Sequence, residues 1–133
     1  MQIILSDHNC EGHAKALFEV LRYRGWLDMI PMKLLWFRDV GLSDRAGDET
    51  VWRFCQEHDY LLLTGNRTTT DKDDSLEIII RRLITPKSLP VVTIGNLKRL
   101  LAVPEYRERC AIRLAEIVLD LEKVRGVTRL FIP

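Results

Sequence analysis

The sequence predicts one α/β domain spanning residues 1–133, in which a parallel sheet lies between two layers of helices. Short apolar runs, typical of strands buried on both faces, alternate with stretches whose apolar residues recur at helical spacing. The chain is long enough to bury a core, and its 47% hydrophobic and 29% charged content is that of a globular domain. No linker, internal repeat or low-complexity tract breaks the alternation. This order of elements predicts a three-layer architecture.

The first half of the chain predicts three strands and two helices. Residues 3–5 form an apolar strand, and the helix that follows ends at Gly25 with an inward face of Ala14, Leu17, Phe18 and Leu21. Residues 33–37 predict a second strand. A helix after Gly47 then precedes a buried strand over residues 60–64. The core-facing positions of that helix are Val51, Phe54, Cys55 and His58.

The second half continues the alternation. A helix that ends before Pro86 has its apolar residues at Leu76, Ile79, Ile80 and Leu83. Residues 89–94 predict a buried strand that Gly95 stops. Pro104 suits the first turn of a long helix that ends before Gly126, with an inward face of Cys110, Leu114, Ile117, Val118 and Leu121. Residues 130–132 predict a short edge strand or a docked tail.

Composition narrows the class of protein. No apolar run approaches the roughly 20 residues of a membrane helix, and the first residues lack the features of a signal peptide, so we expect a cytoplasmic protein with no membrane association. The three cysteines have no metal-ligand spacing and predict reduced core thiols. Residues 1–66 hold 7 basic and 10 acidic residues, whereas residues 67–133 hold 13 and 9. This asymmetry suits an enzyme that acts on a polyanion.

Acidic and amide residues gather where predicted strands end and helices begin. Asp7 follows the first strand, and Asn66 follows the strand over residues 60–64. Asp48 and Glu49 open a helix. In a parallel sheet these positions converge on one crevice, and a cluster of carboxylates there suits a hard divalent cation. Structural roles are the alternative: Asp7 or Asn9 as a helix N-cap, and the acids at 48 and 49 as favourable charges in a first helical turn.

Residues 68–75 predict a polar loop directly after the turn over residues 64–67. Its acids, with Asn9, are candidate additional ligands: Asp71, Asp73 and Asp74. The alternative is a solvated loop whose last residues cap the next helix. Mg²⁺ keeps several waters and often needs only one or two protein carboxylates together with a substrate phosphate, so a complete cage is not required.

Basic residues beside the predicted site are candidates for phosphate contacts, and ordinary surface charge is the alternative for each. The nucleic-acid-binding candidates are Arg67, Lys72, Arg81, Arg82, Lys98 and Arg99, and further cations follow at Lys87, Arg107, Arg109 and Arg113.

Four motifs occur in a characteristic order: Asp7-x-Asn9, Arg-Asp-Val-Gly-Leu-Ser over residues 38–43, Gly-Asp-Glu over 47–49, and Leu-Leu-Leu-Thr-Gly-Asn-Arg over 61–67. This order resembles the PIN-like nucleases, above all their short bacterial branch, the DUF5615 or Mut7-C-like proteins, and it covers the first half of the chain. The resemblance implies a Rossmann-like PIN fold and a Mg²⁺- or Mn²⁺-dependent ribonuclease that cleaves RNA phosphodiester bonds. Such proteins are often the toxin of a toxin–antitoxin pair, which implies RNA and an antitoxin protein as partners.

Carried over by position, the resemblance makes Asp7, Asp48 and Glu49 the metal ligands and groups them with Asn66 in the catalytic site. Asn66 stands where the family usually has a further aspartate, and Asn9 where it often has an acid. An amide oxygen can coordinate a hard cation but adds no charge.

These departures define a second function: a catalytically degenerate PIN-like module that binds RNA or a protein partner without cleavage. A receiver-like phosphoacceptor domain ranks third, because it needs an aspartate at the place of Asn66. For the apolar segment over residues 26–37, core packing is the first interpretation and a homodimer interface the second.

Overall fold

Five parallel strands form one sheet in the order β2-β1-β3-β4-β5. The computed structural model describes the backbone of residues 1–65 and 71–133, and the side chains of residues 1–65 and 76–133. The strands are β1 (Gln2–Ser6), β2 (Met32–Leu35), β3 (Leu61–Gly65), β4 (Val91–Ile94) and β5 (Arg129–Ile132). The sheet confirms the predicted α/β class with a parallel sheet, and β5 confirms the edge strand at the end of the chain.

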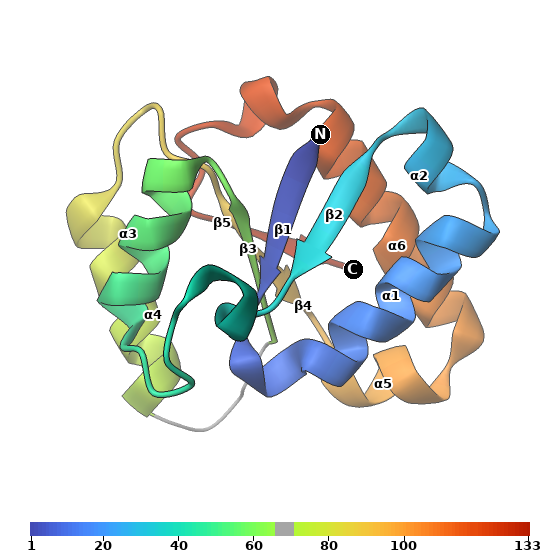
Figure 1. Ribbon diagram of the computed structural model, residues 1–133, viewed down its shortest axis with the longest axis horizontal. Coiled ribbons are helices and arrows are strands. Elements are labelled where there is room, and N and C mark those ends of the chain that lie inside the picture. The colour runs from blue at the N-terminus through green and yellow to red at the C-terminus, as the bar shows by residue number, and fades with distance from the viewer. Residues whose placement is uncertain (66–70) are drawn as a thin grey trace.

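Helices cover both faces of this sheet, which gives the predicted three layers (Figure 1). One face carries α1 (Glu11–Tyr23), α5 (Leu97–Ala102) and α6 (Pro104–Leu119), with the short α2 (Trp26–Met29) beside α1. The other face carries α3 (Asp48–His58) and α4 (Asp71–Leu83). Short 3-10 turns are η1 (His8–Cys10), η2 (Phe37–Val40) and η3 (Leu121–Val124). Among the described residues, no helix is long and apolar enough to cross a membrane.

Side-chain alternation along the strands divides the apolar residues between two cores. Leu61 and Leu63 of β3 join the core beneath α1 and α6, whereas Leu62 joins the core beneath α3 and α4. Ile4 and Leu5 of β1 divide in the same way. The three cysteines are buried and form no disulfide, as predicted.

The connection from β4 to β5 has the opposite hand to the other crossovers. The crossovers from β1 to β2 and from β3 to β4 run in opposite directions over opposite faces, so they share one hand. The last crossover runs in the same direction as β3 to β4, but through α6 over the α1 face (Figure 1). Crossovers between parallel strands are nearly always right-handed, so this left-handed one is unusual. Its consequence is that α6 packs against α1.

The helices differ from the sequence prediction in two places. The segment over residues 71–75 is the first turn of α4 and not a loop, which corrects the placement of Asp71, Asp73 and Asp74. Acids are favoured at this end of a helix by its dipole. The long helix that begins at Pro104 ends at Leu119, and the 3-10 turn η3 fills the residues before Gly126.

His58 does not face the core as its spacing predicted. Its ring is exposed, stacks on Phe54 with centroids 4.1 Å apart, and places Nδ1 2.9 Å from the Phe54 carbonyl oxygen. Trp52, only 4% exposed, is buried in this helix instead. The buried face of α3 therefore includes Trp52 in place of His58, so it is rotated around the helix relative to the predicted face.

Candidate functional site

The carboxyl ends of β1 and β3 mark the point at which the strand order reverses. The chain leaves β1 for β2 over the α1 face, and then passes β1 over the α3 face to reach β3. Open parallel sheets bind ligands outside the carboxyl ends of their strands at such a switch point. Asp7 follows β1 here, and its backbone N–H donates to the Leu63 carbonyl at 2.9 Å. The sheet thus fixes the Asp7 backbone at the switch point.

Two buried threonines continue the row that Asp7 begins. Ser6 pairs with Leu63 in the ladder, so Asp7 stands opposite Thr64, and Thr64 in turn pairs with Thr93 of β4. The hydroxyl oxygens of Thr64 and Thr93 lie 3.2 Å apart. Neighbouring strands are about 4.8 Å apart, so the Asp7 backbone and the two hydroxyls lie on adjacent strands near the carboxyl edge. The proximity of these hydroxyls depends on the strand order, so the sequence alone does not predict it.

A second set of buried polar contacts holds the turn from β1 into η1. The Ser6 hydroxyl donates to the Asp7 carbonyl at 3.0 Å, and the backbone N–H of Cys10 donates to the same carbonyl at 3.1 Å. Cys10 Sγ lies 3.5 Å from the Leu63 carbonyl oxygen and 3.6 Å from Ser6 Oγ. These contacts restrain the backbone on both sides of Asp7.

Asp48 and Glu49 are neighbours in sequence but belong to different surfaces of α3. Asp48 begins the buried stripe of the helix, which continues at spacings of three, four and seven residues to Val51, Trp52 and Cys55. Val51 shares a core with Leu5, and Asp7 lies two residues after Leu5, directly beyond the end of β1. Asp7 directly follows β1 and Asp48 is the first residue of α3, so both acids lie at the carboxyl end of the strands.

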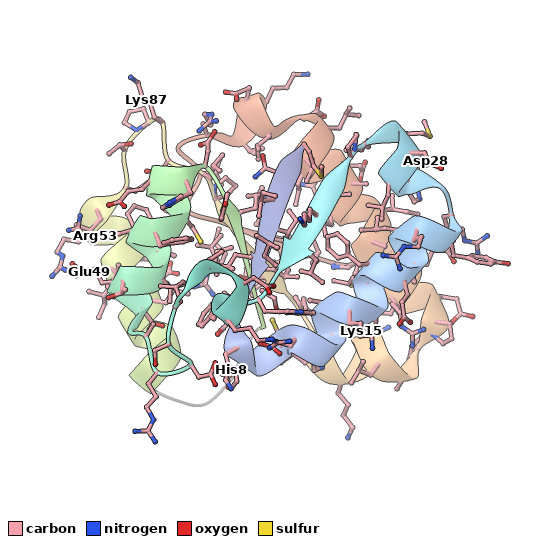
Figure 2. The ribbon with its side chains drawn as sticks, in the orientation of Figure 1. His8, Lys15, Asp28, Glu49, Arg53 and Lys87 are labelled. Carbon is pink, nitrogen blue, oxygen red and sulfur yellow. The ribbon has the colours of Figure 1, made fainter. Side chains whose placement is uncertain are left out.

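Glu49 lies outside that stripe and takes part in two ion pairs. Its carboxylate accepts from Arg53 Nε at 3.0 Å and from an Arg82 Nη at 2.7 Å. Figure 2 shows Glu49 and Arg53 together on the outer side of α3. These contacts link α3 to α4, and they favour the structural interpretation of Glu49 over the metal ligand that the resemblance implies.

The predicted nucleic-acid-binding residues fall into two electrostatic classes. On α4, Arg82 is paired with Glu49, and Arg81 lies 3.4 Å from Glu77. On α5, Lys98 and Arg99 form no ion pair with any described carboxylate.

Arg99 shares an aromatic ring with a second unpaired arginine. Its guanidinium carbon lies 4.6 Å from the centre of the Tyr106 ring, and that of Arg109 lies 5.6 Å from the same centre. Arg109, like Arg99, forms no ion pair with a described carboxylate. Two guanidinium groups and Lys98 thus define a cationic corner where α5 meets α6, which we call the α5 corner (Lys98, Arg99 and Arg109).

The α5 corner is fixed to the same edge of the sheet as Asp7. A Cβ placed on Gly65, at the end of β3, would lie 2.7 Å from the Leu97 side chain, so α5 packs directly on that strand end. His13 of α1 also contacts Leu97: burial lowers the pKa of His13, and a hydrogen bond to the Leu97 backbone opposes this effect. Asn96 caps α5 by accepting from the Arg99 N–H at 2.9 Å.

Contacts between polar side chains join the loops that surround this edge. His8 Nδ1 lies 3.6 Å from a Glu11 carboxylate oxygen and 3.4 Å from an Asp44 carboxylate oxygen. Arg38 reaches the other oxygen of Glu11 at 3.3 Å. The residues come from η1, α1, η2 and the loop before α3, and Figure 2 shows His8 at this end of the molecule.

The predicted metal ligands do not form a cluster among the described residues. Asn66 and Arg67 lie outside the described residues, as do the side chains of Asp71, Lys72, Asp73 and Asp74. Asn9 is exposed in η1, and it, Asp7 and Asp48 each have an interaction partner. Within the described part of the chain, no group of three or more His, Cys, Asp or Glu side chains is arranged to hold a metal ion.

Comparison with protein-family models, with curated proteins and with solved structures found no match to this chain.

Proposed function

We propose that this protein is a PIN-like ribonuclease that uses Mg²⁺ or Mn²⁺ to cleave RNA phosphodiester bonds. The observation that carries the proposal is the position of Asp7, a carboxylate held by the backbone of the sheet at the switch point between β1 and β3. That point is where parallel sheets bind their ligands, and a carboxylate there suits a hard cation.

The donor set fits such an ion. Asp7 and Asp48 supply carboxylate oxygens at the carboxyl end of the strands, and Mg²⁺ requires only one or two protein carboxylates beside water and phosphate. A bound ion would supply an activated water and stabilise the negative charge that develops on the scissile phosphate. The chain's own contribution is to hold the two carboxylates in place, through the Asp7 backbone contact and the buried stripe of α3.

The α5 corner is the surface that we assign to the RNA backbone. Its three cations have no described carboxylate partner, whereas Arg81 and Arg82 are already paired. Cations that neutralise phosphates supply most of the sequence-independent affinity for nucleic acid. We therefore propose that the RNA strand lies along α5 and α6, away from the outer surface of α3 and α4. A toxin role with an antitoxin partner belongs to the same proposal.

A degenerate module that binds RNA or a protein without cleavage is the second candidate. Asn66 and Asn9, where the resembling family has or often has acids, favour it because both lower the negative charge of the site.

Thermal unfolding in the presence of Mn²⁺ separates the two. A cation bound at the site stabilises the folded state by about 2.7 kcal/mol at a concentration 100 times its dissociation constant, which raises the midpoint. We expect this rise for the native chain, its loss in Asp7→Asn, and its retention in Asp28→Asn, a matched control on α2 far from His8 (Figure 2). If Mn²⁺ does not raise the unfolding midpoint of the native chain but the chain still binds RNA, the degenerate module is the correct assignment.

A further inference from the structure

Among the described residues, β2 is an edge strand and no strand lies beside its outer backbone groups. Gln2 donates its N–H to the Pro31 carbonyl at 3.2 Å and pairs with Met32 in the register. In a parallel ladder this pattern directs the N–H and C=O of Lys33 toward β1, and those of Met32 and Leu34 away from it. In the part of the chain that the structure describes, Figure 1 shows no helix or strand in front of β2. Such an edge is a template for one more strand.

A pocket of about 360 Å³ runs between this edge and α1. We call it the β2 groove, and its lining residues are Lys15, Phe18, Glu19, Arg22, Leu27, Met32, Lys33, Leu34 and Trp36. Met32 and Phe18 belong to the core beneath α1, and Leu34 and Leu27 pack against it. A strand laid beside β2 would place every second side chain on this apolar surface.

The charges of the β2 groove are unbalanced. Lys15, Arg22 and Lys33 line it against one acid, Glu19, and none of the four forms an ion pair with a described residue. Figure 2 shows Lys15 on α1 on the side of the molecule where β2 lies. An acidic occupant complements this surface.

The same charges disfavour a second copy of this chain as the occupant. Antiparallel pairing that joins Met32 of one chain to Leu34 of the other sets the two Lys33 side chains directly opposite each other. Like charges in that position destabilise a strand pair, and Lys15 and Arg22 of both copies add further cations. The groove therefore fits a different chain.

We propose that the β2 groove binds an extended acidic segment of a partner protein, which adds to the sheet as a sixth strand beside β2. Its backbone pairs with Met32 and Leu34, its alternate apolar side chains cover the floor beside α1, and its carboxylates lie on the same face of the sheet as Lys33. Lys15 and Arg22 add positive charge along the groove that attracts an acidic segment. This surface is independent of the proposed nuclease site, because it lies along an edge strand and not at the carboxyl end of β1 and β3.

The test uses the full chain and two fluorescein-labelled octapeptides, one of four Val-Glu repeats and one of four Val-Lys repeats. Fluorescence anisotropy measures binding, and NMR hydrogen exchange measures protection of individual amides. We expect only the Val-Glu peptide to bind, and we expect it to slow hydrogen exchange at the amides of Met32 and Leu34.

Charge-reversed variants locate the contact. Lys33→Glu and Lys15→Glu should each weaken Val-Glu binding about tenfold or more, whereas Lys87→Glu, an exposed control remote from the groove (Figure 2), should leave it unchanged. Circular dichroism checks that each variant is folded.

Four results overturn the proposal. They are a dissociation constant above about 1 mM for the Val-Glu peptide, equal binding of both peptides, unprotected amides at Met32 and Leu34, and unchanged binding by both groove variants. If short RNA binds the groove in place of the peptide, with its affinity lost in Lys15→Glu and Lys33→Glu, the surface is a polyanion site and the proposal also fails.

Discussion

Replacing Lys98 and Arg99 together by glutamine should flatten the salt dependence of RNA binding. Each cation that neutralises a phosphate of single-stranded nucleic acid contributes about 0.7 to the slope of log affinity against log salt concentration. Both residues lack a described carboxylate partner, so both are available, and the slope should fall by about 1.4. Between about 50 and 200 mM salt, the native chain should lose about sevenfold more affinity than the variant.

Arg81→Gln with Arg82→Gln is the matched control. These two arginines are paired with Glu77 and Glu49, so their removal breaks surface ion pairs worth at most about 1 kcal/mol and should leave the slope unchanged. Fluorescence anisotropy of a labelled single-stranded RNA, titrated in EDTA at several salt concentrations, measures both slopes. The assignment of RNA to the α5 corner is wrong if the α4 pair lowers the slope as much as the α5 pair does.

Three further predictions concern the fold that holds the site. Leu63→Ala, at a fully buried position of β3, should lower the free energy of unfolding by about 3 to 5 kcal/mol in chemical denaturation; a loss under about 1 kcal/mol would contradict the assigned core. Gly95→Ala places a Cβ 2.2 Å from the Pro133 carbonyl oxygen and should lower the free energy of unfolding by about 1 to 3 kcal/mol. The control Gly12→Ala, whose Cβ would have no atom within 4 Å, should leave stability unchanged or raise it slightly. Equal effects of the two variants would refute the close contact at Gly95. Burial raises the pKa of the Cys55 thiol from 9.0 to about 12. Above pH 9 the unfolded chain therefore loses a proton that the folded chain keeps, and stability falls as the pH rises from 9 to 12. From about pH 8 to pH 10, the free energy of unfolding of Cys55→Ala should fall by about 1 kcal/mol less than that of the native chain. Identical decreases would exclude this linkage.

The elements that the sequence predicted well are those whose periodicity is long or whose apolar run is unbroken. The helix through Leu17 and Leu21 and the strand through residues 61–63 are examples, since both bury the predicted faces. Helix α5 was missed because six residues give too few turns to establish a period. The start of α4 was missed because a run of aspartates has the composition of a loop, although the helix dipole favours it in a first turn.

The candidate site was predictable only as a set of positions. The order of strands and helices sufficed to bring Asp7 and the start of α3 to one edge of the sheet. The pairing of Thr64 with Thr93 depends on strand order and register. Likewise, the ion pairs of Glu49 depend on how α4 packs beside α3, and spacing along one helix carries no information about a partner on another.

The most direct test of the central claim is cleavage of a mixed RNA pool by the native chain and by Asp7→Asn, each with Mg²⁺, with Mn²⁺ and with EDTA. The native chain should cut RNA only when the cation is present, and Asp7→Asn should lose cleavage while its circular dichroism spectrum stays native, because a carboxylate at the switch point is replaced by a neutral amide. Unchanged cleavage by folded Asp7→Asn protein would contradict the assignment of this carboxylate to the catalytic site.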